Sequence, residues 1–303
     1  MKIMEMLPPM PSPKDDNPAD GLVSESCLCL YTLELADDKS ANVLVTQDLK
    51  PLDTPEEAIT SALLSIASEN WFVQYEAIEI FRRALVHHSS LAAPHLANVL
   101  DVLQDASMNL RSTTSKNALL ALAECFEYTN EEVKTFDLQH VIEAIMKRAA
   151  CEKRFLRDAA TLCLKNLATF VHTFPVLCTF TGFSTNKNSK LVTAAANATS
   201  LCLLHMQLEG ESLRVHQISE ILPGIAQFQN GKDAKAREDA TRSLLLLVAF
   251  AETPEAFQKI VSQTIHDKIV AAKVLQLLHA KKESVPVKTN GLRAALRSRN
   301  NPQ

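Results

Sequence analysis

Glycine is scarce in this 303-residue chain, which has only six, and aromatic residues make up just 5% of it. Glycine supplies the positive φ angles of tight hairpin turns and the close backbone approach of nucleotide-binding loops, so both kinds of structure are disfavoured. Hydrophobic residues still account for 47% of the chain, which is ample for a core. The rest of the composition is dominated by good helix formers. We therefore predict an all-α protein.

Long apolar runs are also missing. The longest, such as residues 244–251, fall far short of the roughly 20 residues that a membrane-spanning helix needs. Within the first 20 residues, Glu5 and five prolines interrupt any apolar segment typical of a signal peptide. We expect a cytosolic protein that does not bind membranes.

Charge of one sign does not dominate the chain. The net charge is −4, and the acidic excess lies in residues 1–54, with 4 basic and 10 acidic side chains. Residues 281–303 are basic, with 6 basic side chains against one acid, which leaves 21 against 24 in between. No broad basic face for nucleic acid is predicted.

Motifs for catalysis or metal binding are not found. The seven cysteines include no CxxC pair, and no histidine lies at zinc-finger spacing from them, so buried free thiols in a reducing compartment are expected. Cys27 and Cys29 leave a metal or redox pair open as an alternative. The nine histidines accompany no acid–base pair, Walker loop or HExxH motif. We expect no enzyme, no cofactor and no metal.

Apolar residues recur at helical spacing from residue 53 onward. A helix start is indicated by Asp53, Pro55 and two following acids. From there, two kinds of helix alternate. The first members of the pairs are predicted at residues 55–67, 92–105, 138–150, 173–181, 213–228 and 254–266. The second members are predicted at residues 72–88, 111–127, 154–171, 188–207, 234–251 and 268–280.

The second helices share a template with a polar residue, a small residue at +3 and small or aliphatic residues at +6, +7 and +10. The template begins at Gln74, Ser112, Arg157, Arg237 and Lys268, with a blurred copy near Lys190. A period near 40 residues with two helices per unit is typical of HEAT and armadillo repeats. The small residues allow adjacent helices to approach to about 8–10 Å. We predict an α-solenoid of about six HEAT-like helix pairs.

Three regions follow from this pattern. Residues 1–52 are an N-terminal extension, partly disordered, in which residues 22–35 favour a strand or a docked helix and residues 37–50 a linker. Residues 53–280 form the repeat domain. Residues 281–303 are a basic, flexible tail expected to assist binding to acidic surfaces.

The only tryptophan, Trp71, lies at the predicted break between the first two helices. In one interpretation it packs back as a staple against the preceding helix. In the other it is an exposed anchor for a partner, since Trp is enriched in binding hot spots. Position alone leaves both open.

The turns between first and second helices are predicted to line one edge of the solenoid. Four of the five candidate turns carry Lys or Arg close to a helix N-terminus, where a cation opposes the helix dipole. This favours pairing with an acidic partner, although polar residues are expected in any solvated turn.

The residues also resemble a known family. Residues 55–59, 68–71 and 76–78, then 109–115 and 155–158, resemble a TOG domain, and the crescerin and CLASP variants are the most similar. The resemblance spans about residues 52–280. It implies a six-repeat, tubulin-binding domain of the cytoplasmic cytoskeleton, with a cilium or flagellum favoured by the crescerin likeness. The residues implied to contact tubulin are Asn70, Trp71, Arg111, Ser112, Arg154, Arg157, Lys187, Lys190, Lys235 and Arg237.

One departure from the family pattern lies after Trp71, where members carry basic residues and this chain has Phe72, Val73 and Gln74. The predicted partner is αβ-tubulin or microtubules. The alternative is a general HEAT adaptor for another acidic protein. A peptide carrier of the nuclear-transport kind would need regularly spaced Asn and Trp along an inner groove, which a single tryptophan does not supply.

Overall fold

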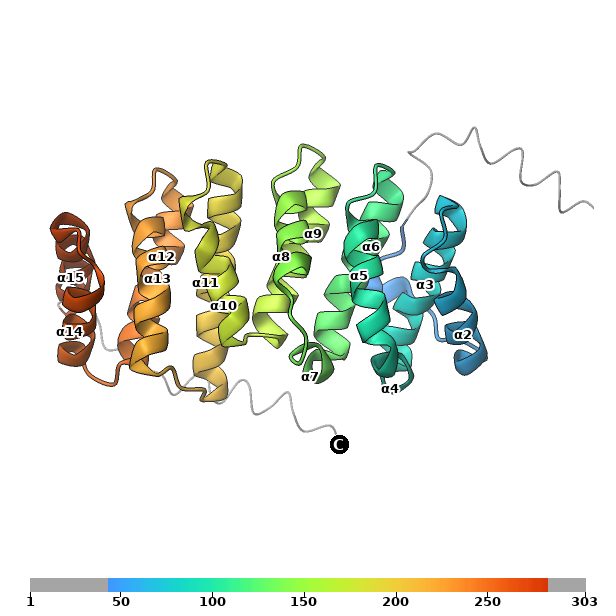
Figure 1. Ribbon diagram of the computed structural model, residues 1–303, viewed down its shortest axis with the longest axis horizontal. Coiled ribbons are helices and arrows are strands. Elements are labelled where there is room, and N and C mark those ends of the chain that lie inside the picture. The colour runs from blue at the N-terminus through green and yellow to red at the C-terminus, as the bar shows by residue number, and fades with distance from the viewer. Residues whose placement is uncertain (1–42, 283–303) are drawn as a thin grey trace, which may run out of the picture. The chain divides into compact units, whose positions relative to one another are not determined.

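The computed structural model describes residues 43–282, with side chains to residue 277. Predictions for residues 1–42, including the Cys27/Cys29 pair and residues 22–35, lie outside this range, as do those for residues 283–303. Within it the chain forms helices and no strand. Six helix pairs follow one another in sequence order (Figure 1), so the predicted solenoid is confirmed.

The helix bounds agree with the prediction to within four residues. The first members are α2 (Pro55–Ser65), α5 (Leu96–Ser107), α8 (Gln139–Ala149), α10 (Phe174–Gly182), α12 (Val215–Asn230) and α14 (Pro254–Thr264). The second members are α3 (Trp71–His87), α6 (Ser112–Tyr128), α9 (Arg154–Phe170), α11 (Ser189–Glu209), α13 (Ala234–Phe250) and α15 (Lys268–Lys282). Short turns not predicted from the sequence are η1 (Thr46–Asp48), α4 (Ser89–Ala92), η2 (Ala93–His95), α7 (Asn130–Val133) and η3 (Phe183–Thr185).

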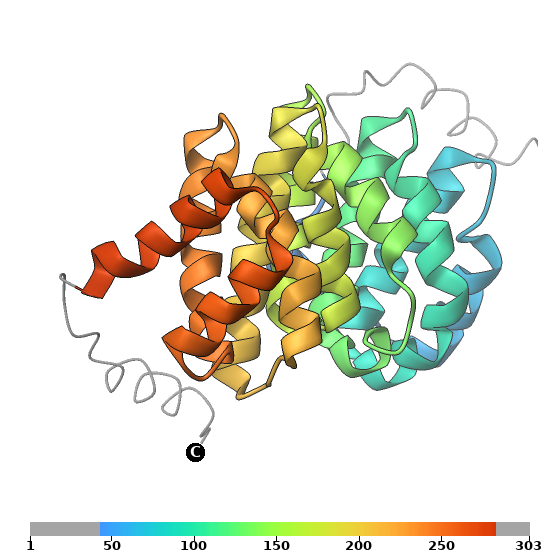
Figure 2. The ribbon, with the colours of Figure 1, turned by 60° about the vertical axis from the view of Figure 1, so that its left-hand side comes forward.

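The two kinds of helix form two layers (Figures 1 and 2). In one layer α3, α6, α9, α11 and α13 contact each other in that order, and in the other α5, α8, α10, α12 and α14 do the same. The small template residues Ala77, Ala118, Ala160 and Ala240 are at most 2% exposed, as close helix packing requires. By length and composition α11 is apolar enough to span a membrane, but here it packs between α9 and α13.

One close approach in the first-helix layer depends on glycine. Gly224 in α12 faces α10, and a Cβ atom built on it would lie 2.8 Å from both Cβ and the carbonyl oxygen of Thr181. Such a contact is too short for any other residue without displacing a helix. The shape of the fourth and fifth pairs therefore depends on this position.

The five described cysteines are free, and Cys125, Cys163 and Cys202 are buried. Burial raises the pKa of all three thiols. They are core residues, as the sequence predicts.

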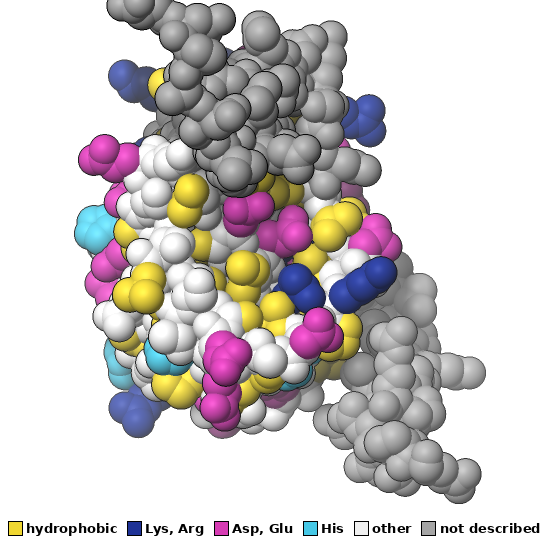
Figure 3. Space-filling model, turned by 90° about the vertical axis from the view of Figure 1, so that its right-hand side faces the viewer, with side chains coloured by type: hydrophobic (Ala, Val, Ile, Leu, Met, Phe, Trp, Pro, Cys, Tyr) yellow, Lys and Arg dark blue, Asp and Glu magenta, His cyan; other side chains and the backbone are white. Residues whose placement is uncertain are grey.

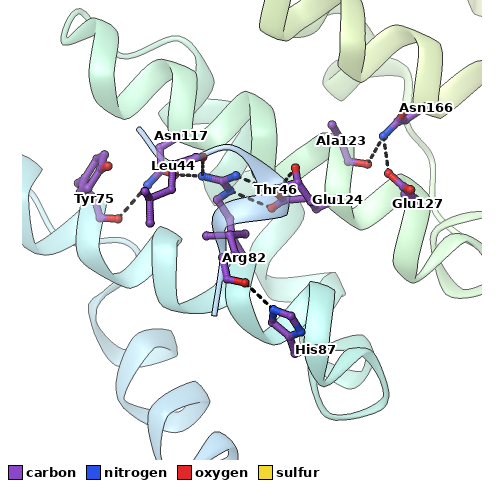
Figure 4. A network of polar contacts seen from close by, with 11 residues as sticks. Leu44, Thr46, Tyr75, Arg82, His87, Asn117, Ala123, Glu124, Glu127 and Asn166 are labelled. Atoms are coloured by element: carbon purple, nitrogen blue, oxygen red, sulfur yellow. Dashed lines mark hydrogen bonds and ion pairs between the residues drawn. The ribbon is translucent and has the colours of Figure 1, made fainter. Parts of the chain in front are cut away.

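The segment before the first pair packs on the solenoid (Figure 4), so the linker predicted for residues 37–50 is wrong over residues 43–50. Val43, Leu49 and Leu52 are buried. The fully buried Arg82 donates to Leu44 O at 2.9 Å, and it also binds both carboxylate oxygens of Glu124 at 2.7 and 2.8 Å. A buried ion pair of this kind needs all its hydrogen bonds satisfied, and the backbone of this segment supplies one of them.

Candidate functional site

The turns that join first to second helices lie along one edge of the solenoid, the upper edge in Figure 1, which we call the turn edge. Each of the first five turns ends on an extended residue that precedes the second helix: Asn70, Arg111, Lys153, Asn188 and Asp233. The side chains of Asn70, Asn188 and Asp233 accept a hydrogen bond from the new helix, and this bond lowers the pKa of Asp233. The predicted site residue Asn70 is therefore a helix cap, with its side chain exposed.

Trp71 is the first residue of α3 and is only partly buried. The guanidinium carbon of Arg111, on the second turn, lies 4.4 Å from the centre of the indole ring, and the Phe72 ring meets the indole edge-on at 5.7 Å between centroids. A guanidinium over an indole face is an attractive cation–π contact. The structure thus brings together two predicted site residues from neighbouring repeats.

The second turn carries the most exposed large hydrophobic side chain among the described residues. Leu110 is 96% exposed, and Met108 beside it is 41% exposed. The turn is held in place by Arg148 from α8, which donates to Ser107 O at 2.7 Å and to Asn109 O at 2.9 Å. Leu110 was not among the predicted site residues. The signal for it is an aliphatic residue in a polar turn, outside the apolar period of either helix.

Ser112, in contrast, is only 3% exposed and bonds the ammonium group of Lys153. It begins α6, and its neighbours Thr113, Thr114 and Ser115 are buried as well. The tubulin-contacting role implied for Ser112 therefore has no exposed surface to act through, and Lys153, which covers it, is the exposed side chain at this place.

At the third turn two predicted arginines have different environments. The Arg154 side chain is 87% exposed, and its Nε atom lies 3.7 Å from Asp158 Oδ2, which is a long distance for an ion pair. Phe155 next to it is 44% exposed. Arg157 is half-buried and donates through Nη1 to Cys151 O at 3.0 Å and to Glu152 O at 2.5 Å. Arg154 points to solvent, whereas Arg157 closes the turn.

The same turn-closing contact recurs at the fourth residue of the second helix. Gln74 donates to Ile66 O, Ser115 to Ser107 O, and Arg237 to Gly231 O and Lys232 O. These bonds satisfy carbonyls at the end of the first helix or in the turn after it. The cations at Arg157 and Arg237 therefore have an internal use, which the sequence pattern attributed to a partner.

This contact also corrects the repeat register in the second pair, where the sequence template began at Ser112 instead of Ser115. With Ser115 as the equivalent residue, the spacing from Gln74 through Ser115 to Arg157 becomes 41 and 42 residues. A shift of three residues leaves the same helix face toward the core, so hydrophobic periodicity does not distinguish the two registers.

The fourth and fifth turns carry exposed lysines. Lys187 and Lys235 form no ion pair with any residue in the described range. Lys190 binds Glu152 of the third turn at 2.9 Å and thereby lowers the pKa of that carboxyl group. Between these turns lies an open depression of about 570 Å³, lined by Glu152, Lys190 and Lys235 among others. Attraction of an anionic group is the chemistry that this part of the edge offers.

The first three turns together present one surface, which we call the apolar–cationic patch. It consists of Trp71, Met108, Leu110, Arg111, Arg154 and Phe155. Exposed apolar side chains beside arginines are typical of a protein-binding surface. Asn117 on α6 and Asn166 on α9 are buried, and their side chains donate to Tyr75 O and Ala123 O respectively (Figure 4). Neither side chain is therefore free to bind a peptide backbone.

The comparisons with known proteins agree with this fold. No family model matches the chain. The chain is 23% identical over 237 residues, 76% of its length, to TOG array regulator of axonemal microtubules protein 1 of Mus musculus. It is 20% identical over 208 residues, 67% of its length, to crescerin-like protein che-12 of Caenorhabditis elegans. These matches span only 13% and 16% of the relatives' own lengths.

Among solved structures, the MAST/Orbit N-terminal domain aligns over 77% of this chain and 98% of its own, with a TM-score of 0.53 and 15% identity. The predicted resemblance to TOG proteins is confirmed. The TOG-like chain thus carries, on the edge that the resemblance points to, a patch that only partly coincides with the residues implied from sequence.

Proposed function

We propose that this TOG-like domain is a non-enzymatic binding module that engages αβ-tubulin, free or in microtubules, through its turn edge. The names of its relatives as regulators of axonemal microtubules support this partner. The observation that carries the proposal is the apolar–cationic patch, where Leu110 is 96% exposed and Trp71 lies under Arg111. Trp and Arg are the residues most enriched in binding hot spots.

The two halves of the edge have different tasks in this proposal. The apolar–cationic patch supplies the desolvated contact area that holds the complex together. Lys187 and Lys235, which are exposed and unpaired among the described residues, supply attraction to an acidic partner before contact. Lys190 contributes less, because it is already paired with Glu152.

The family pattern has basic residues after the tryptophan, and this chain lacks them. Val73 is 36% exposed, and Gln74 is occupied by its bond to Ile66 O. Arg111 brings a cation to the same place from the second turn. We propose that Arg111 takes over the charge contact at the first turn.

The test is co-elution of the full chain with unpolymerised αβ-tubulin on a sizing column, followed by measurement of Kd. Leu110→Ser should weaken binding at least about tenfold, whereas Leu208→Ser should not, since Leu208 is 45% exposed in the last turn of α11, at the end of that helix opposite the turn edge. Hydrophobic side chains are spread over the surface at the α2/α3 end of the solenoid (Figure 3), so the control leucine is taken from α11 instead. Equal effects of both substitutions would contradict the assignment of the patch.

Charge reversal tests the second half of the edge. Lys235→Glu should slow association and reduce its salt dependence, whereas Lys259→Glu, an exposed position on α14, should leave both unchanged. If the chain binds neither tubulin nor microtubules at physiological salt, the tubulin proposal is wrong. We propose localisation to the cytoskeleton, in cilia or flagella, which imaging of the tagged full chain tests.

A further inference from the structure

A cluster of three metal-ligand side chains lies away from the turn edge, at the opposite end of the helices. His172 follows directly on the last turn of α9, Glu209 is the last residue of α11, and Glu211 comes two residues later. Gly210 between the two glutamates has φ of +79°, which ends α11 in a left-handed cap that other residues rarely adopt. One ligand atom from each of the three side chains lies within 4.8 Å of the others.

A contact with a backbone carbonyl determines which ring nitrogen of His172 carries the hydrogen. Nδ1 lies 2.8 Å from Thr169 O, and because a carbonyl only accepts, Nδ1 carries the proton. The imidazole side chain is 1% exposed, and its Nε2 atom is buried without a hydrogen-bond partner. Metal-binding histidines typically donate their other ring N–H in this way, to a backbone carbonyl or a carboxylate.

The free nitrogen faces both carboxylates. Nε2 lies 3.0 Å from Glu209 Oε2 and 3.5 Å from Glu211 Oε1, although neither oxygen lies in the direction of a hydrogen bond. In a tetrahedral site with metal–ligand bonds of about 2.0–2.1 Å, ligand atoms lie about 3.3 Å apart and off the nitrogen–metal axis. The observed separations lie on either side of that value. The glutamate side chains are 53% and 40% exposed, which leaves water access to a fourth position.

The surroundings suit a cation. Two carboxylates face one imidazole, and the ring of His205 lies 6.2 Å from that of His172, centroid to centroid. Burial lowers the pKa of His205, and the neighbouring His172 adds to this. Lys165 on α9 is the opposing cation near this group.

We propose that His172, Glu209 and Glu211 form a binding site for a divalent transition-metal ion of the zinc class. The imidazole ligand favours zinc and related ions over Mg²⁺ and Ca²⁺, which prefer all-oxygen ligands. Such an ion joins the C-terminal ends of α9 and α11, and therefore the third repeat to the fourth. The site is separate from the turn edge and independent of the tubulin proposal. The sequence did not predict it, because His172 and Glu209 are 37 residues apart and share no motif.

The experiment is titration of the untagged full chain with Zn²⁺ against a chromogenic chelator, under reducing conditions, with Co²⁺ as a spectroscopic probe. The proposal expects one equivalent of Zn²⁺ and a higher melting temperature with Zn²⁺ but not with Mg²⁺. Glu209→Gln and Glu211→Gln should each lower the affinity by at least about tenfold and abolish the thermal shift. Both side chains are exposed enough for these variants to fold.

Glu132→Gln is the matched control, since Glu132 is an exposed carboxylate on α7 that forms no ion pair within residues 43–282. It should bind Zn²⁺ like the parent. The proposal is overturned if no stoichiometric site is found, or if the Glu209 and Glu211 variants bind as tightly as the control. A Co²⁺ spectrum with thiolate charge-transfer bands would also overturn it, because the ion would then be held by cysteine.

Discussion

Truncation of Trp71 to alanine separates the two roles proposed for this side chain, because each predicts a different balance of stability and binding. The indole is partly buried, and complete burial of a large apolar side chain contributes about 1.5–3 kcal/mol, so about half of this is at stake. The cation–π contact with Arg111 adds about 0.5–1 kcal/mol. We expect Trp71→Ala to lower the free energy of unfolding by about 2 kcal/mol.

The binding loss should be larger. Truncated aromatic anchors cost about 2–4 kcal/mol, which raises the Kd for tubulin about 30- to 1000-fold. Urea denaturation and a tubulin-binding assay on the same preparation measure both quantities. Trp71→Phe, which keeps a ring under Arg111, serves as the control and should retain most of the binding.

A staple gives the opposite result. If Trp71 only fixes the start of α3 against α2, its removal creates a core defect of about 3–5 kcal/mol, and the protein that remains folded binds like the parent. That combination would refute the anchor reasoning. The double variant with Arg111→Ala sharpens the test, because a shared contact makes the two binding losses less than additive.

Three further predictions concern the scaffold. Arg82→Met should cost about 3–5 kcal/mol by leaving Glu124 buried without its partner, and adding Glu124→Leu should recover much of this in urea denaturation. Burial raises the pKa of Glu124, and Arg82 opposes that rise, so the variant's carboxylate takes up a proton more readily in the folded state. The variant's loss of unfolding free energy should therefore shrink toward pH 5 and grow as the pH rises, and a loss that does not depend on pH would contradict this. Arg157→Leu should lower stability by about 1–2 kcal/mol through loss of its bonds to the third turn, with unchanged tubulin Kd; weakened binding without lost stability would show that Arg157 contacts the partner. Gly224→Ala should destabilise by about 1–3 kcal/mol through its clash with α10, while the control Gly182→Ala, with open space around it, should not; melting temperatures decide.

The fold could be predicted from the sequence because each level of the pattern agrees with the others. The second helices repeat small residues at fixed offsets, and only a stack of helices buries all of them. The segment around η1 was missed because its polar residues, such as Thr46 and Asp48, conceal the buried Val43, Leu49 and Leu52. Its packing depends on Arg82, which looks like an ordinary surface cation in the sequence. A buried ion pair 42 residues apart leaves no local periodic signal.

The sequence predicts which edge of the solenoid carries the candidate site, but not all of the residues exposed there. The sequence pattern predicts the turns and indicates Trp71, which is partly buried, and Arg154, which is exposed. It also indicates Ser112, which is buried, because a serine at a helix start looks the same in the sequence whether it faces solvent or the next repeat. Leu110 was missed because exposed leucines are common and only its surroundings show that nothing covers it.

Position within the turn determines whether a cation on the turn edge bonds to backbone carbonyls of the protein or faces solvent. A side chain at the fourth residue of a second helix points back toward the carbonyls that end the first helix, so an arginine there, such as Arg157 or Arg237, is drawn inward. A cation at the first or second residue, or just before the helix, has no such acceptor, as Arg111, Arg154 and Lys235 show. The repeat thus separates two sets of cations that composition alone treats as one. Only the second set, together with the exposed apolar side chains of the first three turns, is available to a partner, and it is there that substitutions should change binding without changing the fold.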